Sequence, residues 1–378
     1  MGSTGSVGQK ALQVVESLGE GYSIIALSAN SKVDLLAEQA RRYRPMCVAV
    51  TDSSHAGRLC DLLEGTGIEV VSGPESLTEI AELPEVDVVL AAVVGAAGLP
   101  AVFAAAQKGK QLAIANKEPL VIAGELLMKA ARSSGATVLP VDSEHSAVFQ
   151  AMQAGRRDEV SRIVLTASGG PFRDARFEQL QDVTAEQALA HPVWQMGPKI
   201  TIDSATMMNK ALEIIEARWL FDIPVEKIDV LVHPESIIHS MVEFVDGSMI
   251  AQLGEPDMCL PIQYALTYPR RVAGIGRRLR LEEIGALTFE RPNADVFRAL
   301  PLAYEVVQKG GTAPAVLNGA NEAAVQEFLA GSIKFGNIVE LVEHCVNEHK
   351  VKAGACVEEL LEADAWARKE VSALVCRT

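Results

Sequence analysis

The stretch that decides the fold opens the chain: Gly2-Ser-Thr-Gly5-Ser-Val-Gly8, followed by residues 9–17 with helical spacing of apolar side chains. Glycines at these intervals let backbone N–H groups approach a pyrophosphate at a helix N-terminus. The pattern is GxxGxxG rather than the commoner GxGxxG, and glycine-rich turns also occur without a ligand. The strand–helix alternation behind this loop favours a dinucleotide-binding domain.

Short apolar runs after the loop indicate a parallel sheet. They are interrupted by amphipathic helical stretches, and strands buried on both faces have this near-continuous apolar character. We expect strands at Tyr22–Leu27, Cys47–Val50, Val86–Val94 and Gln111–Ala115.

The end of the first of these strands bears on the choice of dinucleotide. A site for NAD usually has an acidic residue there, which binds the ribose 2′-hydroxyl. Here the strand is followed by Asn30, Ser31 and Lys32, which can donate to a 2′-phosphate. An ordinary polar loop is the alternative, and the charge favours NADP.

One feature of the glycine loop departs from the expected pattern. The loop should follow a strand, and only Met1 precedes it here. Either Met1 corresponds to an internal position of the natural gene, or the fold lacks its usual first strand. We hypothesise that Met1 is internal to the natural gene.

The sequence pattern of the remaining chain changes near residue 141. Strand-like segments at 163–167, 230–233 and 248–253, a helical stretch near 205–221 and an Asp-Gly turn at 246–247 predict a mixed α+β region. We therefore expect an α/β protein with a Rossmann-like parallel sheet, a central α+β domain and a helical C-terminal domain. The expected boundaries are 1–141, 142–269, a linker at 270–293, and 294–378.

Composition excludes several classes of protein. A net charge of −15 without long Lys/Arg runs argues against a nucleic-acid binder. No apolar run is long enough to span a bilayer, and no targeting segment is recognisable. The six cysteines form no CxxC pair, which indicates reduced thiols and a cytoplasmic protein.

Asp142-Ser143-Glu144 follows an apolar strand and offers a candidate metal site. In an extended segment Asp142 and Glu144 point the same way and repel unless a cation lies between them. Oxygen ligands of this kind suit Mg²⁺ or Mn²⁺. A solvated acidic turn is the alternative, and His145 is interpreted as structural.

A second polar group lies on the helical stretch after Asp203-Ser204. Either of these residues suits a helix N-cap. Asn209, Lys210 and Glu213 share one face of a helix that is otherwise largely apolar, which predicts that they are buried and need partners. A solvated face with a simple Lys–Glu pair is the alternative.

Two further segments suit an anion. Ser168-Gly169-Gly170 ends a strand in a turn with a hydroxyl and free N–H groups, and Ser204 with Asn209 and Lys210 forms a second set of donors. Between them His191–Lys199, with Trp194, predicts a lid over a ligand. A plain turn and a tryptophan that anchors the loop to the core are the alternatives.

These motifs together resemble the 1-deoxy-D-xylulose 5-phosphate reductoisomerase family from the first residues to the C-terminal helices. The similarity rests on GSTGSVG, VGAAGLP, ANKEPL, LPVDSEHSAVFQ, TASGGPFR, HPVWQMGPK, IDSATMMNKALEIIEARWLF, HPESIIHSMV, QLGEPDM and LNGANEAAV, in family order. The resemblance implies NADPH-dependent reductive isomerisation of 1-deoxy-D-xylulose 5-phosphate to 2-C-methyl-D-erythritol 4-phosphate, in the non-mevalonate isoprenoid pathway. It also implies a homodimer, and Mg²⁺ or Mn²⁺ with Co²⁺ as a third candidate.

The resemblance also assigns residues. It implies metal binding by Asp142, Glu144 and Glu213, with Lys117 completing the catalytic set. The substrate residues it implies are Lys117, Ser143, Ser168, His191, Trp194, Ser204, Asn209, Lys210 and Glu213. The NADPH residues are Thr4, Gly5, Ser6, Val7, Asn30, Ser31, Lys32, Asn116, Glu118 and Gly197.

Departures from the family pattern are few: Pro119 stands where serine is expected, Glu235 where glutamine is expected, and Cys259-Leu260 where the pattern is more polar. One rival function is a related NADPH-dependent reductase acting on another phosphorylated polyol or keto acid. A rival from a different class is a non-catalytic NADPH-binding protein. The presence of Lys117 and the three acidic residues argues against the second rival.

Overall fold

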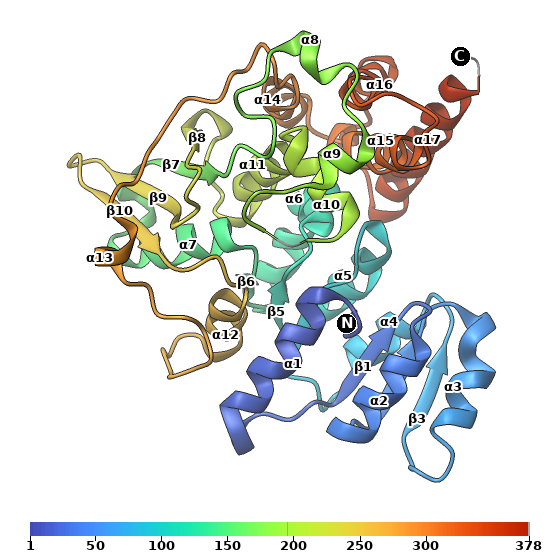
Figure 1. The fold of residues 1–378 in the computed structure, drawn as a ribbon. Helices are drawn as coiled ribbons and strands as arrows, with labels where there is room; N and C mark the ends of the chain where they lie inside the picture. The colour runs from blue at the N-terminus through green and yellow to red at the C-terminus, as the bar shows by residue number, and fades with distance from the viewer. Residues whose placement is uncertain (195, 377–378) are drawn as a thin grey trace. The chain divides into compact units, whose positions relative to one another are not determined.

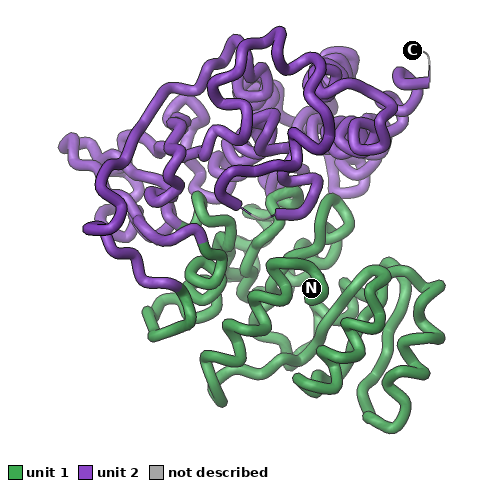
Figure 2. Tube along the Cα trace, in the orientation of Figure 1, with its two compact units in different colours: residues 1–119, 127–146, 257–276 green, residues 120–126, 147–256, 277–378 purple. Residues whose placement is uncertain are grey.

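The chain folds into two compact units, each assembled from several segments. The computed structural model describes residues 1–194 and 196–376 (Figure 1). Unit 1 comprises residues 1–119, 127–146 and 257–276, and unit 2 comprises residues 120–126, 147–256 and 277–378 (Figure 2). Among the described residues, none of the helices combines the length and apolar character needed to cross a bilayer.

Unit 1 contains two three-stranded parallel sheets, in the orders β1-β2-β3 and β4-β5-β6. Their strands are β1 (Ala26–Ala29), β2 (Cys47–Val50), β3 (Glu69–Ser72), β4 (Val88–Ala91), β5 (Gln111–Ile114) and β6 (Val138–Pro140). All of β2 is buried, as its continuous apolar sequence predicts.

The predicted strands of this unit are confirmed with shifted ends. β2 has the predicted bounds, and β4 and β5 lie inside the predicted runs. The first strand starts at Ala26 rather than Tyr22, so that prediction was wrong over its first four residues. β3 was not predicted, because both of its end residues, Glu69 and Ser72, are exposed and polar.

Helices connect the parallel strands, as right-handed crossovers require. They are α1 (Ser6–Leu18), α2 (Val33–Tyr43), α3 (Ala56–Leu62), α4 (Ser76–Glu82), α5 (Leu99–Gln107) and α6 (Glu118–Ser134), and the later α12 (Cys259–Thr267) also belongs to unit 1. The core around β1 and β2 includes Leu27, Leu36, Val48 and Leu59. α6 is interrupted at Ala123, whose φ of −131° is not helical, and passes from one unit to the other in this region.

Unit 2 contains a four-stranded mixed sheet in the order β10-β9-β7-β8. Its strands are β7 (Val160–Ala167), β8 (Ile228–Val232), β9 (Ile238–Phe244) and β10 (Met249–Leu253). β7 and β8 are parallel, whereas β9 pairs antiparallel with β7 and β10. The predicted Asp-Gly turn is confirmed: it joins β9 to β10, with Glu243 opposite Met249.

The helices of unit 2 include α15, which is buried along most of its length. They are α7 (Ser143–Ala151, which starts in unit 1), α8 (Phe177–Leu180), α9 (Ala185–Leu189), α10 (Pro198–Ala205), α11 (Met208–Leu220), α13 (Leu281–Ile284), α14 (Ala299–Lys309), α15 (Ala313–Leu329), α16 (Asn337–Glu348) and α17 (Val357–Val375). Arg368 on α17 forms ion pairs with Asp364 at 2.6 Å and with Glu322 on α15 at 2.8 Å. The predicted helical character of the region from residue 294 is confirmed.

The segment that leads to α14 is tied to the sheet by a buried histidine. The Nε2 atom of His233 accepts hydrogen bonds from the backbone N–H groups of Ile237 and Ile238, at 3.2 and 3.1 Å. Its proton therefore lies on Nδ1, which is 2.9 Å from the carbonyl oxygen of Thr288. Glu235 accepts from the backbone and hydroxyl of the same threonine, so a carboxylate serves where glutamine was expected.

Candidate active site

The glycine loop packs in a way that only glycine permits at two positions. A Cβ atom on Gly8 would lie 2.2 Å from the carbonyl oxygen of Gly2, and one on Gly2 (φ +76°) would lie 2.4 Å from that of Ala92. Real Cβ atoms do not approach this closely, so side chains here would force α1 and the end of β4 apart from the loop. Gly5 is the N-cap of α1, so the backbone N–H groups of the first turn are oriented for an anion.

The residues expected to bind the cofactor lie on loops that follow the strands. Thr4 is buried, while Gly5 and Ser6 are exposed and Val7 is half-buried. Asn30, Ser31 and Lys32 follow β1 directly and are exposed; the Asn30 side chain accepts from the Thr51 hydroxyl at 2.7 Å. In the second sheet, Asn116 follows β5 and donates to the carbonyl oxygen of Val93.

Lys117 and Asp142 form a buried ion pair in unit 1. The ammonium of Lys117 lies 2.5 Å from a carboxylate oxygen of Asp142, and their side chains are 7% and 15% exposed. Lys117 precedes α6 and Asp142 precedes α7, so both residues occupy helix starts. Glu118, also buried, occupies the first position of α6 and is followed by Pro119, a residue suited to a first helical turn.

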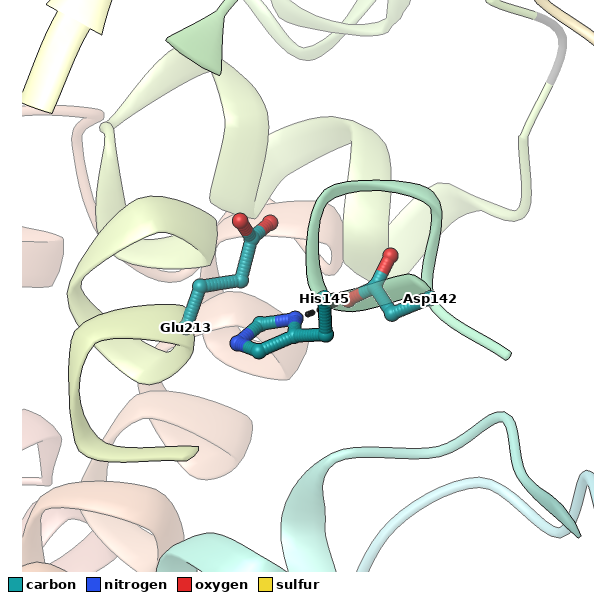
Figure 3. A group of neighbouring side chains, drawn as sticks. All are labelled: Asp142, His145 and Glu213. Carbon is teal, nitrogen blue, oxygen red and sulfur yellow. Dashed lines mark ion pairs between the residues drawn. The ribbon is translucent and has the colours of Figure 1, made fainter. Parts of the chain in front are cut away.

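The expected extended geometry of Asp142 and Glu144 is wrong, because α7 begins at Ser143. Glu144 lies in the first turn and accepts a hydrogen bond from the Ser143 hydroxyl. The same helix places His145, which was interpreted as structural, beside Asp142. In a helix His145 returns toward Asp142, with its Nδ1 3.8 Å from a carboxylate oxygen. Figure 3 draws this ion pair, together with Glu213; all three residues offer atoms that can bind a metal ion.

Of the three polar residues predicted to be buried on α11 in unit 2, Lys210 and Glu213 are buried and Asn209 is half-buried. Glu213 is fully buried, and it receives a 2.6 Å hydrogen bond from the Asn209 amide and an ion pair from Lys210, which is also buried. The ammonium of Lys210 compensates the charge of this buried carboxylate. The alternative of a solvated Lys–Glu pair is therefore excluded.

Ser204 does not start a helix, contrary to the prediction. α10 covers residues 198–205 and α11 begins at Met208, with Met207 between them in the left-handed region (φ +61°). This conformation is costly for a non-glycine residue and is maintained by packing, since Met207 is buried. Asp203 lies inside α10, where it pairs with Lys199 at 2.6 Å and accepts from the Asn321 amide at 2.9 Å.

The Ser-Gly-Gly turn is packed against the end of α10. A Cβ atom on Gly170 would lie 2.7 Å from the carbonyl oxygen of Ser204, so the two predicted anion-binding segments are neighbours. The Ser168 hydroxyl lies 3.1 Å from His191 Nε2, and His191 Nδ1 accepts from the N–H groups of Val193 and Trp194. Because Nδ1 accepts, Nε2 carries the proton and donates to Ser168, which leaves the serine hydrogen for another acceptor. Burial lowers the pKa of His191, consistent with a neutral ring.

The segment predicted to be a lid is a loop through Gly197, which is exposed and caps α10. Trp194 is half-buried, and its ring centroid lies 6.4 Å from that of His239. Gln195 lies outside the described residues. The tryptophan therefore has a partner in unit 2, in line with the anchoring alternative, and whether the loop also closes over a ligand stays a prediction.

Sequence reasoning missed two supporting groups. Asn321 was noted only within a family motif, yet it connects α15 to the buried Asp203 on α10. The signal for it was weak: asparagine in an apolar helix, which predicts burial with a partner. His145 could have been found from its i, i+3 spacing to Asp142, had a helix been expected from Ser143.

Comparisons with known proteins agree along the whole chain. Residues 1–124 match the model of 1-deoxy-D-xylulose 5-phosphate reductoisomerase, and residues 138–221 and 253–370 match models of its C-terminal domains. The enzyme of that name from Trichlorobacter lovleyi is 50% identical over 97% of this chain and 94% of its own length. The one from Chloroherpeton thalassium is 50% identical over 98% and 96%.

Solved structures give the same result. The reductoisomerase from Zymomonas mobilis in complex with NADPH has a TM-score of 0.93 and 44% identity, covering 99% of this chain and 97% of that one. A structure of DOX-P reductoisomerase with NADPH, fosmidomycin and magnesium has a TM-score of 0.94 and 41% identity, with the same coverage. The expected fold class is confirmed.

Proposed function

This chain belongs to the 1-deoxy-D-xylulose 5-phosphate reductoisomerase family, and we propose that the residues described above carry out that family's reaction. The protein is an NADP-dependent oxidoreductase that converts 1-deoxy-D-xylulose 5-phosphate to 2-C-methyl-D-erythritol 4-phosphate. The observation that carries the residue assignment is the buried Lys210–Glu213 pair, to which the half-buried Asn209 donates a hydrogen bond. Burying a carboxylate and an ammonium costs free energy, and binding of a ligand by these groups is a functional reason for that cost.

Asp142, Glu144 and Glu213 are the proposed metal ligands. Asp142 and Glu213 each have a lysine at ion-pair distance, and each offers a carboxylate oxygen, the type of ligand that Mg²⁺ or Mn²⁺ prefers. Glu144 is half-buried in the first turn of α7. When bound, the metal supplies Lewis-acid polarisation of the substrate's carbonyl and neighbouring hydroxyl oxygens. His145 offers a further donor atom at the same helix start, since its Nδ1 lies 3.8 Å from a carboxylate oxygen of Asp142.

The proposed phosphate residues supply donors of different kinds. The Ser168 hydroxyl is oriented by His191, because the imidazole occupies a lone pair of the serine oxygen. Ser204 and Asn209 are half-buried, and Lys210 supplies positive charge. Holding the phosphate away from the reacting carbons positions the substrate without altering its chemistry. Lys117 and Ser143 are proposed to contact the reacting end, and Trp194 to cover it.

NADPH is the proposed hydride donor, bound at the glycine loop. The first turn of α1 receives the pyrophosphate, and the exposed residues Asn30, Ser31 and Lys32 after β1, none of which is acidic, receive the 2′-phosphate. The remaining contacts are assigned to Asn116, Glu118 and Gly197.

We also propose that the protein is a cytoplasmic homodimer. The support for the compartment is that all six cysteines, each within the described residues, are without disulfides. The support for the dimer is the edge of the sheet in unit 2, where Met249 and Ile250 of β10 are 44% and 37% exposed and could pack against a second copy. Light scattering after size exclusion measures the oligomeric state.

The experiment that tests the function follows NADPH oxidation by absorbance with 1-deoxy-D-xylulose 5-phosphate, with and without Mg²⁺ or Mn²⁺, and identifies the product. Metal-dependent formation of 2-C-methyl-D-erythritol 4-phosphate is the expected result. Oxidation with a different phosphorylated polyol or keto acid alone would favour the related-reductase alternative. NADPH binding without turnover on any of these substrates would favour the non-catalytic alternative.

A further inference from the structure

Helices α10 and α11 meet at a strained junction beside the proposed phosphate residues. Met207, which separates the two helices, has a φ of +61°, a conformation that costs a non-glycine residue free energy and persists only where the surroundings impose it. Ser204 lies before this junction, and Asn209 and Lys210 lie after it. The conformation of the junction therefore determines how these three side chains are placed relative to one another.

Asp203 connects this junction to helix α15, against which α10 packs (Figure 1). The Asn321 amide donates to one carboxylate oxygen of Asp203 at 2.9 Å, and the Lys199 ammonium lies 2.6 Å from the other. The Asp203 carbonyl oxygen accepts from the Thr206 hydroxyl at 3.2 Å, and the N–H of Met208 donates to that hydroxyl at 3.3 Å. A chain of hydrogen bonds thus runs from α15 to the first residue of α11.

The ion pair with Lys199 does not by itself explain why Asp203 is buried. Lys199 lies in the first turn of α10 and Asp203 in the last, so each charge is at the helix end with which it interacts unfavourably. Asp203 is 1% exposed, whereas the Lys199 side chain is 21% exposed. Because solvent weakens the ion pair, the hydrogen bond from Asn321 is the contact of Asp203 that lies fully inside unit 2.

Asn321 suits α15 poorly unless its bond to Asp203 is needed. It is fully buried, and its side-chain oxygen accepts no hydrogen bond from the part of the chain that the structure describes. Such an atom costs free energy, so an apolar residue would suit this largely apolar helix better. Asn318, one turn earlier, is equally buried and has the same unpartnered oxygen, but its amide donates to Asp364 on α17. The two asparagines therefore differ in the helix to which they are bonded.

We propose that Asn321 is a positioning residue for phosphate binding: its bond to Asp203 holds the α10–α11 junction, and with it the phosphate residues on both sides, in the binding geometry. The inference rests on the phosphate site proposed above. Asn321 is assigned no contact with substrate or cofactor and acts through Asp203. Its role requires an acceptor oxygen at position 203 rather than a negative charge. Helix α15 thereby takes part in substrate binding.

Three variants of the full chain separate this role from general support of the fold. Asn321→Leu removes the bond to Asp203. Asn318→Leu is the matched control, because it removes an equally buried asparagine of the same helix that is bonded to α17 instead. Asp203→Asn keeps a side-chain oxygen that can accept from Asn321 and removes only the charge.

Binding of inorganic phosphate is measured by NMR titration and binding of NADPH by calorimetry, at a temperature where every variant is folded. Asn321→Leu should weaken phosphate binding at least about fivefold, because it removes a buried hydrogen bond to a charged group. The KM for 1-deoxy-D-xylulose 5-phosphate should rise by a similar factor. NADPH affinity should change less than about twofold, as should phosphate affinity in Asn318→Leu and Asp203→Asn.

Two results would overturn the proposal. Equal phosphate affinity in Asn321→Leu and Asn318→Leu would show that the bond to Asp203 has no special role. A loss in Asp203→Asn as large as that in Asn321→Leu would show that the charge, rather than the bond, is the cause. If Asn321→Leu does not fold, Asn321→Ser takes its place with the same expected result, since a serine hydroxyl can bond to its own helix.

Ser204→Ala distinguishes failure of this inference from failure of the proposed phosphate site. Weaker phosphate binding in Ser204→Ala with unchanged binding in Asn321→Leu would leave the phosphate site intact and refute the positioning role. Unchanged binding in both variants would refute the assignment of Ser204 and the positioning role together. Weaker binding in both, with NADPH affinity preserved, is the expected result.

Discussion

Glu213→Gln tests two roles of one buried carboxylate: its ion pair with Lys210 and its proposed binding of the metal ion. Glu213 is fully buried and its partner Lys210 is 4% exposed at the side chain. The amide keeps the size and can still accept from Asn209, but it leaves the ammonium uncompensated. Breaking a buried pair in this way costs about 3–5 kcal/mol of unfolding free energy. At about 2–4 °C per kcal/mol, the melting temperature should fall by roughly 6–20 °C.

The same change removes one of three proposed charged metal ligands. A loss of several kcal/mol of Lewis-acid stabilisation corresponds to a fall in kcat of at least about a thousandfold. NADPH affinity should change by less than about threefold, since no proposed NADPH contact lies on α11. Turnover is measured by NADPH oxidation at saturating metal, and NADPH binding by calorimetry, both at a temperature where the variant is folded.

The double variant Lys210→Met with Glu213→Gln serves as the matched control. It removes the uncompensated ammonium, so it should recover much of the lost melting temperature. It should not recover turnover, because the ligand is still missing. If Glu213→Gln alone kept more than a tenth of the wild-type kcat, the assignment of Glu213 to the metal would be wrong. If both variants melted alike, the buried pair would not have the energetic role given to it.

Three further predictions follow from local geometry. Gly8→Ala places a methyl group 2.2 Å from the Gly2 carbonyl oxygen and should weaken NADPH binding at least about tenfold by calorimetry, whereas Gly57→Ala in α3, with nothing within 4 Å, should leave it unchanged. Gly124→Ala places a methyl group 2.4 Å from the Trp219 ring and should cost about 1–3 kcal/mol in denaturant unfolding; an unaffected midpoint would contradict the packing. Burial holds the pKa of His191 below its ordinary 6.5, so its contribution to the loop is complete above pH 6.5 and is lost as the pH falls below that value. The protection of the Val193 and Trp194 amides, taken relative to the intrinsic exchange rate at each pH, should therefore decrease below pH 6.5. His191→Gln should abolish this decrease in protection.

The sequence predicts best where one physical effect dominates. The continuous apolar run 47–50 became a strand with those bounds, since burial on both faces leaves no alternative for it. The burial of Glu213 followed from the apolar residues around its helix. Family motifs located the candidate residues, although their roles stay proposals.

Prediction failed where packing overrides local preference. Nothing in Ala205-Thr-Met-Met208 resembles a helix breaker, yet Met207 adopts a left-handed conformation between α10 and α11, so the helix expected from about residue 205 begins at Met208. Ser204 was consequently expected at a helix start. Asp142 and Glu144 were expected on a strand because the run before them is apolar, but the strand ends at Pro140. The preference of these residues for a first helical turn then prevails.

The segmented make-up of unit 1 has a consequence for biosynthesis. Its helix α12 (residues 259–267) lies beside α1, although more than two hundred residues separate them and β7 to β10 of unit 2 are made in between. A ribosome releases the chain from its N-terminus, so one side of α1 stays uncovered until about half of unit 2 has been synthesised. Such long-range closure slows folding and exposes apolar surface to other nascent chains. A fragment ending at residue 141 would keep that surface exposed permanently, and its poor solubility would reflect this order of assembly rather than a weak core.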